Sequence, residues 1–91
     1  MITKNIFYTG KVQGVGFRVS VLALARGYDV LGYVKNLNDG RVEVLVRGEE
    51  NEVDDFLTAI RESHLAGHIE SVQSESIDAA SIAGLRGFQI L

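Results

Sequence analysis

The sequence has no cysteine, no proline and no tryptophan among its 91 residues. The lack of cysteine excludes disulfides, iron–sulfur clusters, thiolate zinc sites and cysteine nucleophiles. No apolar run approaches the ~18 residues that a membrane-spanning helix needs, and the opening residues MITKN lack the pattern of a secretory signal. We therefore expect no membrane association, and the absence of cysteine fits a cytoplasmic location.

An excess of positive charge is also missing, because the formal net charge is −3. This balance argues against general binding of nucleic acid. The charges are unevenly distributed: residues 1–47 carry seven Lys and Arg against three acids, whereas residues 48–91 carry two against nine. The basic half is consistent with an anion site, although an acidic outer face on one helix would explain the same asymmetry.

What the sequence does have is ordinary globular composition, 46% hydrophobic and 23% charged, over a length that suits one domain spanning residues 1–91. Hydrophobic periodicity and turn residues predict the order of elements. The expected elements are a strand over 4–12, a helix over 17–27, strands over 31–35 and 41–47, a helix over 51–63, a strand over 68–77 and a short strand over 87–90.

This order predicts an α+β, ferredoxin-like βαββαβ sandwich with a short extra C-terminal strand. We expect two helices on one face of an antiparallel sheet, and a hairpin whose turn contains Asp39 and Gly40. Such a fold serves enzymes, RNA binders, metal carriers and regulatory modules, so the fold alone does not indicate the function.

The most informative segment is residues 10–18, GKVQGVGFR, where the first strand passes through a glycine loop into a helix. Glycines at 14 and 16 can adopt positive φ, so that successive backbone N–H groups converge on an anion. The positive end of the helix favours the same anion, and Arg18 in its first turn can grip two phosphate oxygens. An ordinary strand–helix turn with an exposed arginine would explain the same residues, and the segment is neither a P-loop nor a dinucleotide fingerprint.

Residues 10–18 resemble, without a mismatch, the signature of the acylphosphatase family. A second motif of that family, an aromatic residue, Val, any residue and Asn followed by Asp-Gly, resembles residues 33–40 with Asn36 as its asparagine. The closing residues 87–90, GFQI, are similar to the family's last motif. The sequence departs from the family pattern at His68, where proline is usual after glycine, and at Asp29, where glycine is frequent.

The resemblance implies hydrolysis of small acyl phosphates to a carboxylate and inorganic phosphate, without metal or cofactor. Arg18 and Asn36 would be the catalytic residues, with Asn36 positioning the attacking water. The phosphate-binding residues would be Gln13, Gly14, Val15, Gly16, Phe17 and Arg18. The partners expected are the acyl phosphate substrate and inorganic phosphate as a product inhibitor, with no nucleic acid and no membrane, and the chain is expected to be a monomer.

Two other readings remain open. Domains similar to acylphosphatases occur as parts of larger proteins, so a non-catalytic module that binds phosphate or carbamoyl phosphate is the alternative function. An RNA-binding ferredoxin-like domain would stack bases on aromatic residues of its central strands, and residues 41–47 contain none.

His64 and His68 stand four residues apart, which would suit a metal on one helix, but the strand expected from about residue 68 argues against helical spacing.

Overall fold

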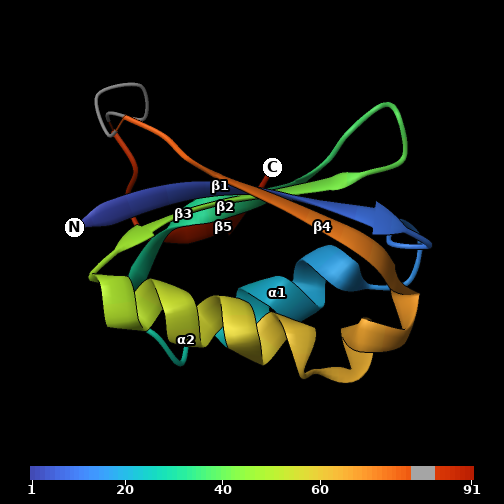
Figure 1. The fold of residues 1–91 in the computed structure, drawn as a ribbon, viewed down its shortest axis with the longest axis horizontal. Helices are drawn as coiled ribbons and strands as arrows, with labels where there is room; N and C mark the ends of the chain where they lie inside the picture. Colours follow the sequence, from blue (N-terminus) through green and yellow to red (C-terminus); the bar gives the residue numbers. More distant parts are fainter. Residues whose placement is uncertain (79–83) are drawn as a thin grey trace.

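The computed structural model describes residues 1–78 and 84–91, and within them two α-helices cover one face of a five-stranded sheet (Figure 1). The strands are β1 (Ile2–Gly10), β2 (Val30–Asn36), β3 (Val42–Gly48), β4 (Ile69–Ser76) and β5 (Phe88–Ile90). The helices are α1 (Phe17–Ala25), α2 (Glu50–Arg61) and the short 3-10 helix η1 (His64–His68). No helix in this part of the chain is long and apolar enough to cross a bilayer.

The strand order is β4-β1-β3-β2-β5, so the ferredoxin-like prediction is confirmed. The sheet is antiparallel over β4-β1-β3-β2, as expected, and departs from the expected antiparallel pairing at the short strand β5, which pairs parallel to β2. Ile2 of β1 and Val30 of β2 both pair with Gly48, so these two strands start at the same end of the sheet. Because β4 finishes at that end, opposite Lys4, a strand returning from it runs in the direction of β2.

The core lies between the sheet and the helices, where the predicted apolar stripes are buried. The helix residues that form it are Phe17, Val21 and Ala25 of α1 and Val53, Phe56 and Ile60 of α2. The ring of Tyr8 on β1 contacts that of Phe17 with centroids 5.2 Å apart, and Phe56 meets Phe88 of β5 at 5.4 Å. The contact between Tyr8 and Phe17 fixes the start of α1 against β1, where the glycine loop lies.

One glycine of the sheet is required by close packing. Gly32 on β2 has a φ of +154°, and a Cβ there would overlap the main-chain carbonyl oxygen of Leu45 on β3. We expect Gly32→Ala to lower the free energy of unfolding by about 3 kcal/mol or more, since backbone strain and a main-chain clash add. Gly67→Ala is the matched control, because nothing lies within 4 Å of a Cβ there. Chemical denaturation of both variants tests this, and equal stabilities would contradict it.

The two departures from the family pattern lie outside the strands and the α-helices. The main-chain N–H of Asp29 donates a 2.7 Å hydrogen bond to Glu52 Oε1, which joins the segment before β2 to the first turn of α2. His68 is the last residue of η1, and β4 begins at the next residue. Neither residue interrupts a strand or an α-helix.

Candidate active site

The loop between β1 and α1 has the backbone conformation of an anion cradle. Gly14 and Gly16 have φ of 78° and 77°, while Val15 between them has negative φ, because no non-glycine residue of the described chain has positive φ. Alternation of this kind turns successive N–H groups toward one side of the loop. A Cβ at either glycine would meet nothing within 4 Å, so these positions require glycine for its φ and not for space.

Helix α1 adds donors to this cradle. Its first intrahelical bond runs from Ser20 N to Gly16 O at 3.0 Å, so the N–H groups of Phe17, Arg18 and Val19 precede the hydrogen-bonded ladder. The N-cap residue Gly16 contributes no side chain to cap them. These free donors and the positive end of the helix dipole point to the same place, which suits an anion.

A hollow of about 110 Å³ lies at the cradle. Its lining residues are Val12, Gly14, Gly16, Phe17, Arg18, Val19 and Asn36. A water molecule occupies roughly 30 Å³ in the liquid, so the hollow has room for an anion a few waters in size. The structure thus brings both predicted catalytic residues and the two cradle glycines to one hollow, although they come from separate parts of the chain.

Arg18 is half-buried, and its guanidinium keeps most of its hydrogen-bonding capacity. Nη1 donates to the main-chain carbonyl oxygen of Leu91 over 3.4 Å, a long bond that orients the side chain without neutralising it. Neither of the two ion pairs within the described residues involves Arg18. A charged fork with free donors beside the cradle is suited to bidentate binding of phosphate.

Asn36, the last residue of β2, supplies an acceptor to the same hollow. Its Oδ1 is buried and has no hydrogen-bond partner within the described residues. Burial of an unpaired polar atom costs about 1–3 kcal/mol, and such atoms are rare in folded proteins. Because Asn36 lines the hollow, a small rotation of its amide would let this unpaired oxygen accept a hydrogen bond from a water molecule there.

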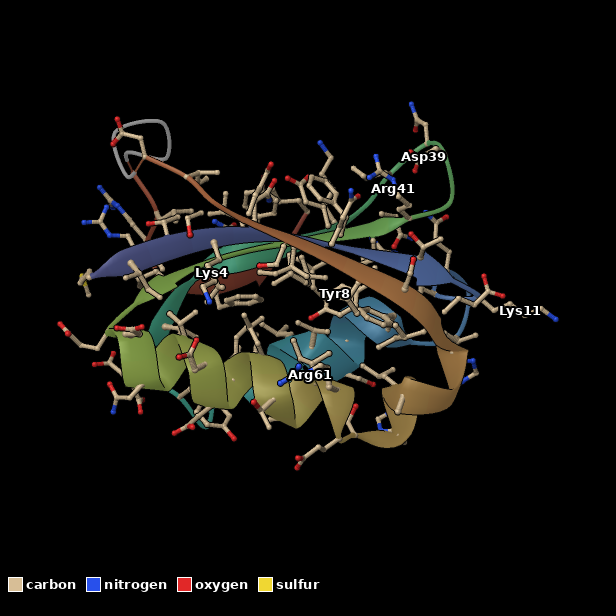
Figure 2. The ribbon with its side chains drawn as sticks, viewed as in Figure 1. Lys4, Tyr8, Lys11, Asp39, Arg41 and Arg61 are labelled. Atoms are coloured by element: carbon tan, nitrogen blue, oxygen red, sulfur yellow. The ribbon has the colours of Figure 1, made fainter. Side chains whose placement is uncertain are left out.

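Gln13 takes part in the site in a way that the sequence did not reveal. Its Nε2 donates to the carbonyl oxygens of Leu37 and Arg41, at 2.7 and 3.0 Å. These two carbonyls flank the β2–β3 turn, which Asp39 closes by binding Arg41 (Figure 2). The side chain of Gln13 therefore ties the cradle loop to the residue after Asn36, and only its main-chain N–H remains for an anion.

We expect Gln13→Ala to lower kcat by ~10-fold, because small misplacements of a positioned group are costly in rate. Phosphate affinity should change little, since the cradle N–H groups and Arg18 remain. Steady-state kinetics on Gln13→Ala, Gln13→Asn and the exposed control Gln73→Ala test this. Asparagine keeps the amide but is too short to span the same gap, so it should behave like alanine. Wild-type kcat in both variants would show that the hydrogen bonds from Gln13 to Leu37 and Arg41 are unimportant for turnover.

The remaining candidates lie elsewhere. The side chains of Gln13 and Val15 do not line the hollow, and Lys11 points outward from the end of β1 (Figure 2). His64 and His68 both belong to η1, so β4 begins one residue later than the strand expected from His68, and positions four apart in a 3-10 helix do not share a face. No group of three metal-ligating side chains occurs within residues 1–78 and 84–91.

The fold and the site together define a class: ferredoxin-like α+β domains with an anion cradle between the first strand and the first helix. Comparison with known proteins identifies the family within it. The acylphosphatase family model matches residues 4–90. An acylphosphatase of Nostoc sp. is 38% identical over 90 residues, covering 99% of this chain and 86% of that protein. The chain belongs to the acylphosphatase family, as its motifs indicated.

Solved structures agree with this assignment. The crystal structure of acylphosphatase from Bacillus subtilis has a TM-score of 0.87 at 33% identity, covering 100% of this chain and 99% of that one. Full-length HypF in its phosphate- and nucleotide-bound form has a TM-score of 0.86 at 30% identity, but the match covers 99% of this chain and 12% of that one. The chain is thus an enzyme of the acylphosphatase family, with a small-molecule acyl phosphate as its substrate.

Proposed function

We propose that the cradle hollow is the catalytic site for acyl phosphate hydrolysis, with the phosphoryl group held by Arg18 and the N–H groups of residues 13–18. Asn36 Oδ1 accepts a hydrogen bond from the attacking water and orients it toward phosphorus. The observation that carries this proposal is the buried, unpaired oxygen of Asn36, a residue that lines the same hollow as Arg18.

The chemistry needs few protein groups. Water adds to phosphorus, the bond between phosphorus and the acyl oxygen breaks, and the carboxylate leaves with the bonding electrons. The conjugate acid of the carboxylate has a pKa of ~4–5, so no general acid is needed. Asn36 cannot take the proton of the water, and a phosphate oxygen of the substrate receives it. The protein's part is positioning and charge neutralisation, which dominate catalysis of phosphoryl transfer.

This site should discriminate by leaving group. We expect the purified chain to hydrolyse acetyl phosphate but to act very weakly on a simple ester such as phenyl phosphate, whose leaving group is far more basic. Inorganic phosphate should inhibit competitively, and excess chelator should leave turnover unchanged. Measurement of phosphate release with each substrate, with and without chelator, tests these expectations. Loss of activity with chelator that a divalent ion restores would contradict the mechanism.

The alternative is a non-catalytic phosphate- or carbamoyl phosphate-binding module. The structural match to HypF covers only 12% of that protein, so a domain of this fold also occurs as a part of a larger protein, and this motivates a test of the alternative. Such a module would bind phosphate without turnover of acetyl phosphate, so the same assay with a binding titration separates the two. A monomeric state and a cytoplasmic location belong to the proposal as well, and light scattering and cell fractionation test them.

A further inference from the structure

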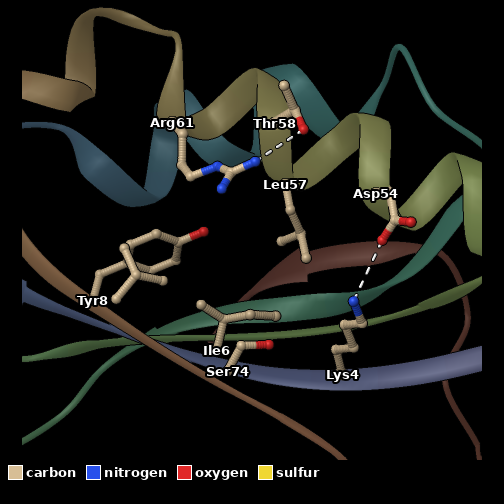
Figure 3. A pocket seen from close by; sticks show the side chains of 9 residues that line it. Lys4, Ile6, Tyr8, Asp54, Leu57, Thr58, Arg61 and Ser74 are labelled. Carbon is tan, nitrogen blue, oxygen red and sulfur yellow. Dashed lines mark hydrogen bonds and ion pairs between the residues drawn. The ribbon is translucent and has the colours of Figure 1, made fainter.

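A second, larger hollow of about 280 Å³ lies between α2 and the strands β1 and β4 (Figure 3). It arises because α2 leaves the helix-facing side of the edge strand β4 uncovered. Val72 of β4 is 44% exposed, and Ser74, which pairs with Ile6 of β1, is exposed as well. The sheet face that is buried over the central strands is thus open to solvent along this edge.

The floor of the hollow is apolar and its ends are polar. Ile6, Leu57 and Val72 supply the apolar surface, from β1, α2 and β4 respectively. Exposed apolar surface in a concave site is characteristic of ligand binding when a few polar groups converge on it. At 280 Å³ the hollow is below the size of most drug-binding pockets, which are roughly 300–1,000 Å³, so a small molecule would fill it.

The charge of the polar groups is positive. At one end Lys4 is paired with Asp54 at 3.3 Å, so this pair is close to neutral. At the other end Arg61 Nη2 donates to Thr58 Oγ1 at 3.2 Å, and no carboxylate within the described residues pairs with Arg61. One uncompensated guanidinium with free donors therefore faces the hollow, which favours a monoanion.

The hydroxyl of Tyr8 is the second polar group at that end. The Tyr8 side chain is 1% exposed, and its hydroxyl has no hydrogen-bond partner within the described residues. Figure 3 shows the hydroxyl directed into the hollow on the side of Arg61. Burial raises the pKa of Tyr8 above its ordinary value, partly offset by the Arg61 charge, so the group remains a donor. Within the described residues the one fully buried side-chain oxygen without a partner is that of Asn36, so the unpaired Tyr8 hydroxyl is open to the hollow, where a ligand or water can pair with it.

We propose that this hollow is a binding site for a small monocarboxylate with an apolar chain. The carboxylate lies between the Arg61 guanidinium and the Tyr8 hydroxyl, which offer charge-assisted donors. The chain lies on Ile6, Leu57 and Val72. Phosphate is a poorer ligand, since it is strongly hydrated and gains nothing from the apolar floor.

This site is distinct from the catalytic hollow, with which it shares no lining residue. The proposal does not depend on the proposed function, and the Arg18→Ala variant separates the two. Hexanoate should bind Arg18→Ala as it binds the wild type, whereas inorganic phosphate should not bind that variant.

The test is titration of the isotope-labelled full chain with sodium hexanoate at constant ionic strength, followed by amide chemical shifts. Because Arg61 is solvent-exposed, a Kd on the order of millimolar is expected. Saturable shifts should centre on Leu57, Thr58 and Val72. Arg61→Gln should weaken binding ~10-fold, the scale of a lost charge-assisted contact. Tyr8→Phe, which keeps the ring packed on Phe17, should weaken it several-fold.

The control variant is Arg47→Gln, which makes the same charge change on the opposite face of the sheet, next to Thr3. It should bind hexanoate normally. Hexylamine carries a positive charge in place of the carboxylate, and hexanol carries none. Both should bind much more weakly than hexanoate if the site requires a negatively charged ligand. The proposal is overturned if hexanoate does not saturate, if hexylamine binds equally well, or if Arg61→Gln and Arg47→Gln are indistinguishable.

Discussion

Replacement of Arg18 by alanine should abolish turnover and phosphate binding together. Arg18 is the cationic side chain that lines the catalytic hollow, and its guanidinium is not neutralised by any acid of the described residues. Loss of two charge-assisted hydrogen bonds should weaken phosphate binding by ~10²-fold or more. The transition state gathers more charge on the same oxygens, so turnover should fall further. Arg18→Lys should recover little, because a point charge does not reproduce the planar fork.

Titration calorimetry with inorganic phosphate and phosphate-release kinetics measure both effects on one preparation. Arg26→Ala is the matched control, since Arg26 is the C-cap of the same helix and lies away from the cradle. It removes the same charge from the chain and should leave affinity and turnover near the wild-type values. If Arg18→Ala keeps its phosphate affinity, the arginine is not part of the phosphate site.

Replacement of Asn36 by alanine should affect kcat and not binding. If Asn36 holds the attacking water, its contact is realised mainly in the transition state, which appears in kcat. We expect kcat to fall by ~10²-fold or more, the scale for one well-placed polar group, while KM and phosphate affinity change by a few-fold. The fold should persist. The free energy of unfolding should change little, because Asn36 Oδ1 makes no hydrogen bond with the described residues that the substitution could remove.

The exposed Asn38, two residues further along the same turn, provides the matched control. Asn38→Ala should leave kcat unchanged. Thermal unfolding, phosphate titration and kinetics on the same samples distinguish the roles of Arg18 and Asn36. A collapse of phosphate affinity in Asn36→Ala with near-normal kcat would mean that the two roles are assigned wrongly.

Much of the fold followed from local pattern, since the stripes that bury Phe17, Val21, Phe56 and Ile60 have helical spacing in the sequence itself. The direction of β5 did not, because alternation in three residues carries no information about the neighbouring strand. Its parallel pairing depends on the end of the sheet at which β4 finishes.

The candidate site, like the fold, was predictable from the sequence only in part. Gly14 and Gly16 indicated the cradle because their conformational freedom is a property of the residue type. The two hydrogen bonds from Gln13 to the β2–β3 turn were not predictable, since they join residues that are 24 and 28 positions apart in the sequence and meet only in the tertiary fold. The unpaired oxygen of Asn36 likewise depends on what surrounds it once the strands have assembled. Motif spacing indicated the residues, and the structure supplied their hydrogen-bonding state.

The position of β3 between β1 and β2 has a consequence for folding kinetics. The cradle follows β1 and Asn36 ends β2, so the two halves of the site come together only after β3 has paired with both. Among the described strand pairs, only β2 and β3 are joined by a short turn. Each of the other pairs forms only after a long stretch of chain has closed into a loop, and the entropy cost of that closure slows the pairing. A peptide limited to residues 10–18 should therefore not bind phosphate. In refolding experiments, phosphate binding should be acquired late, together with β1–β3 pairing and after the hairpin has formed.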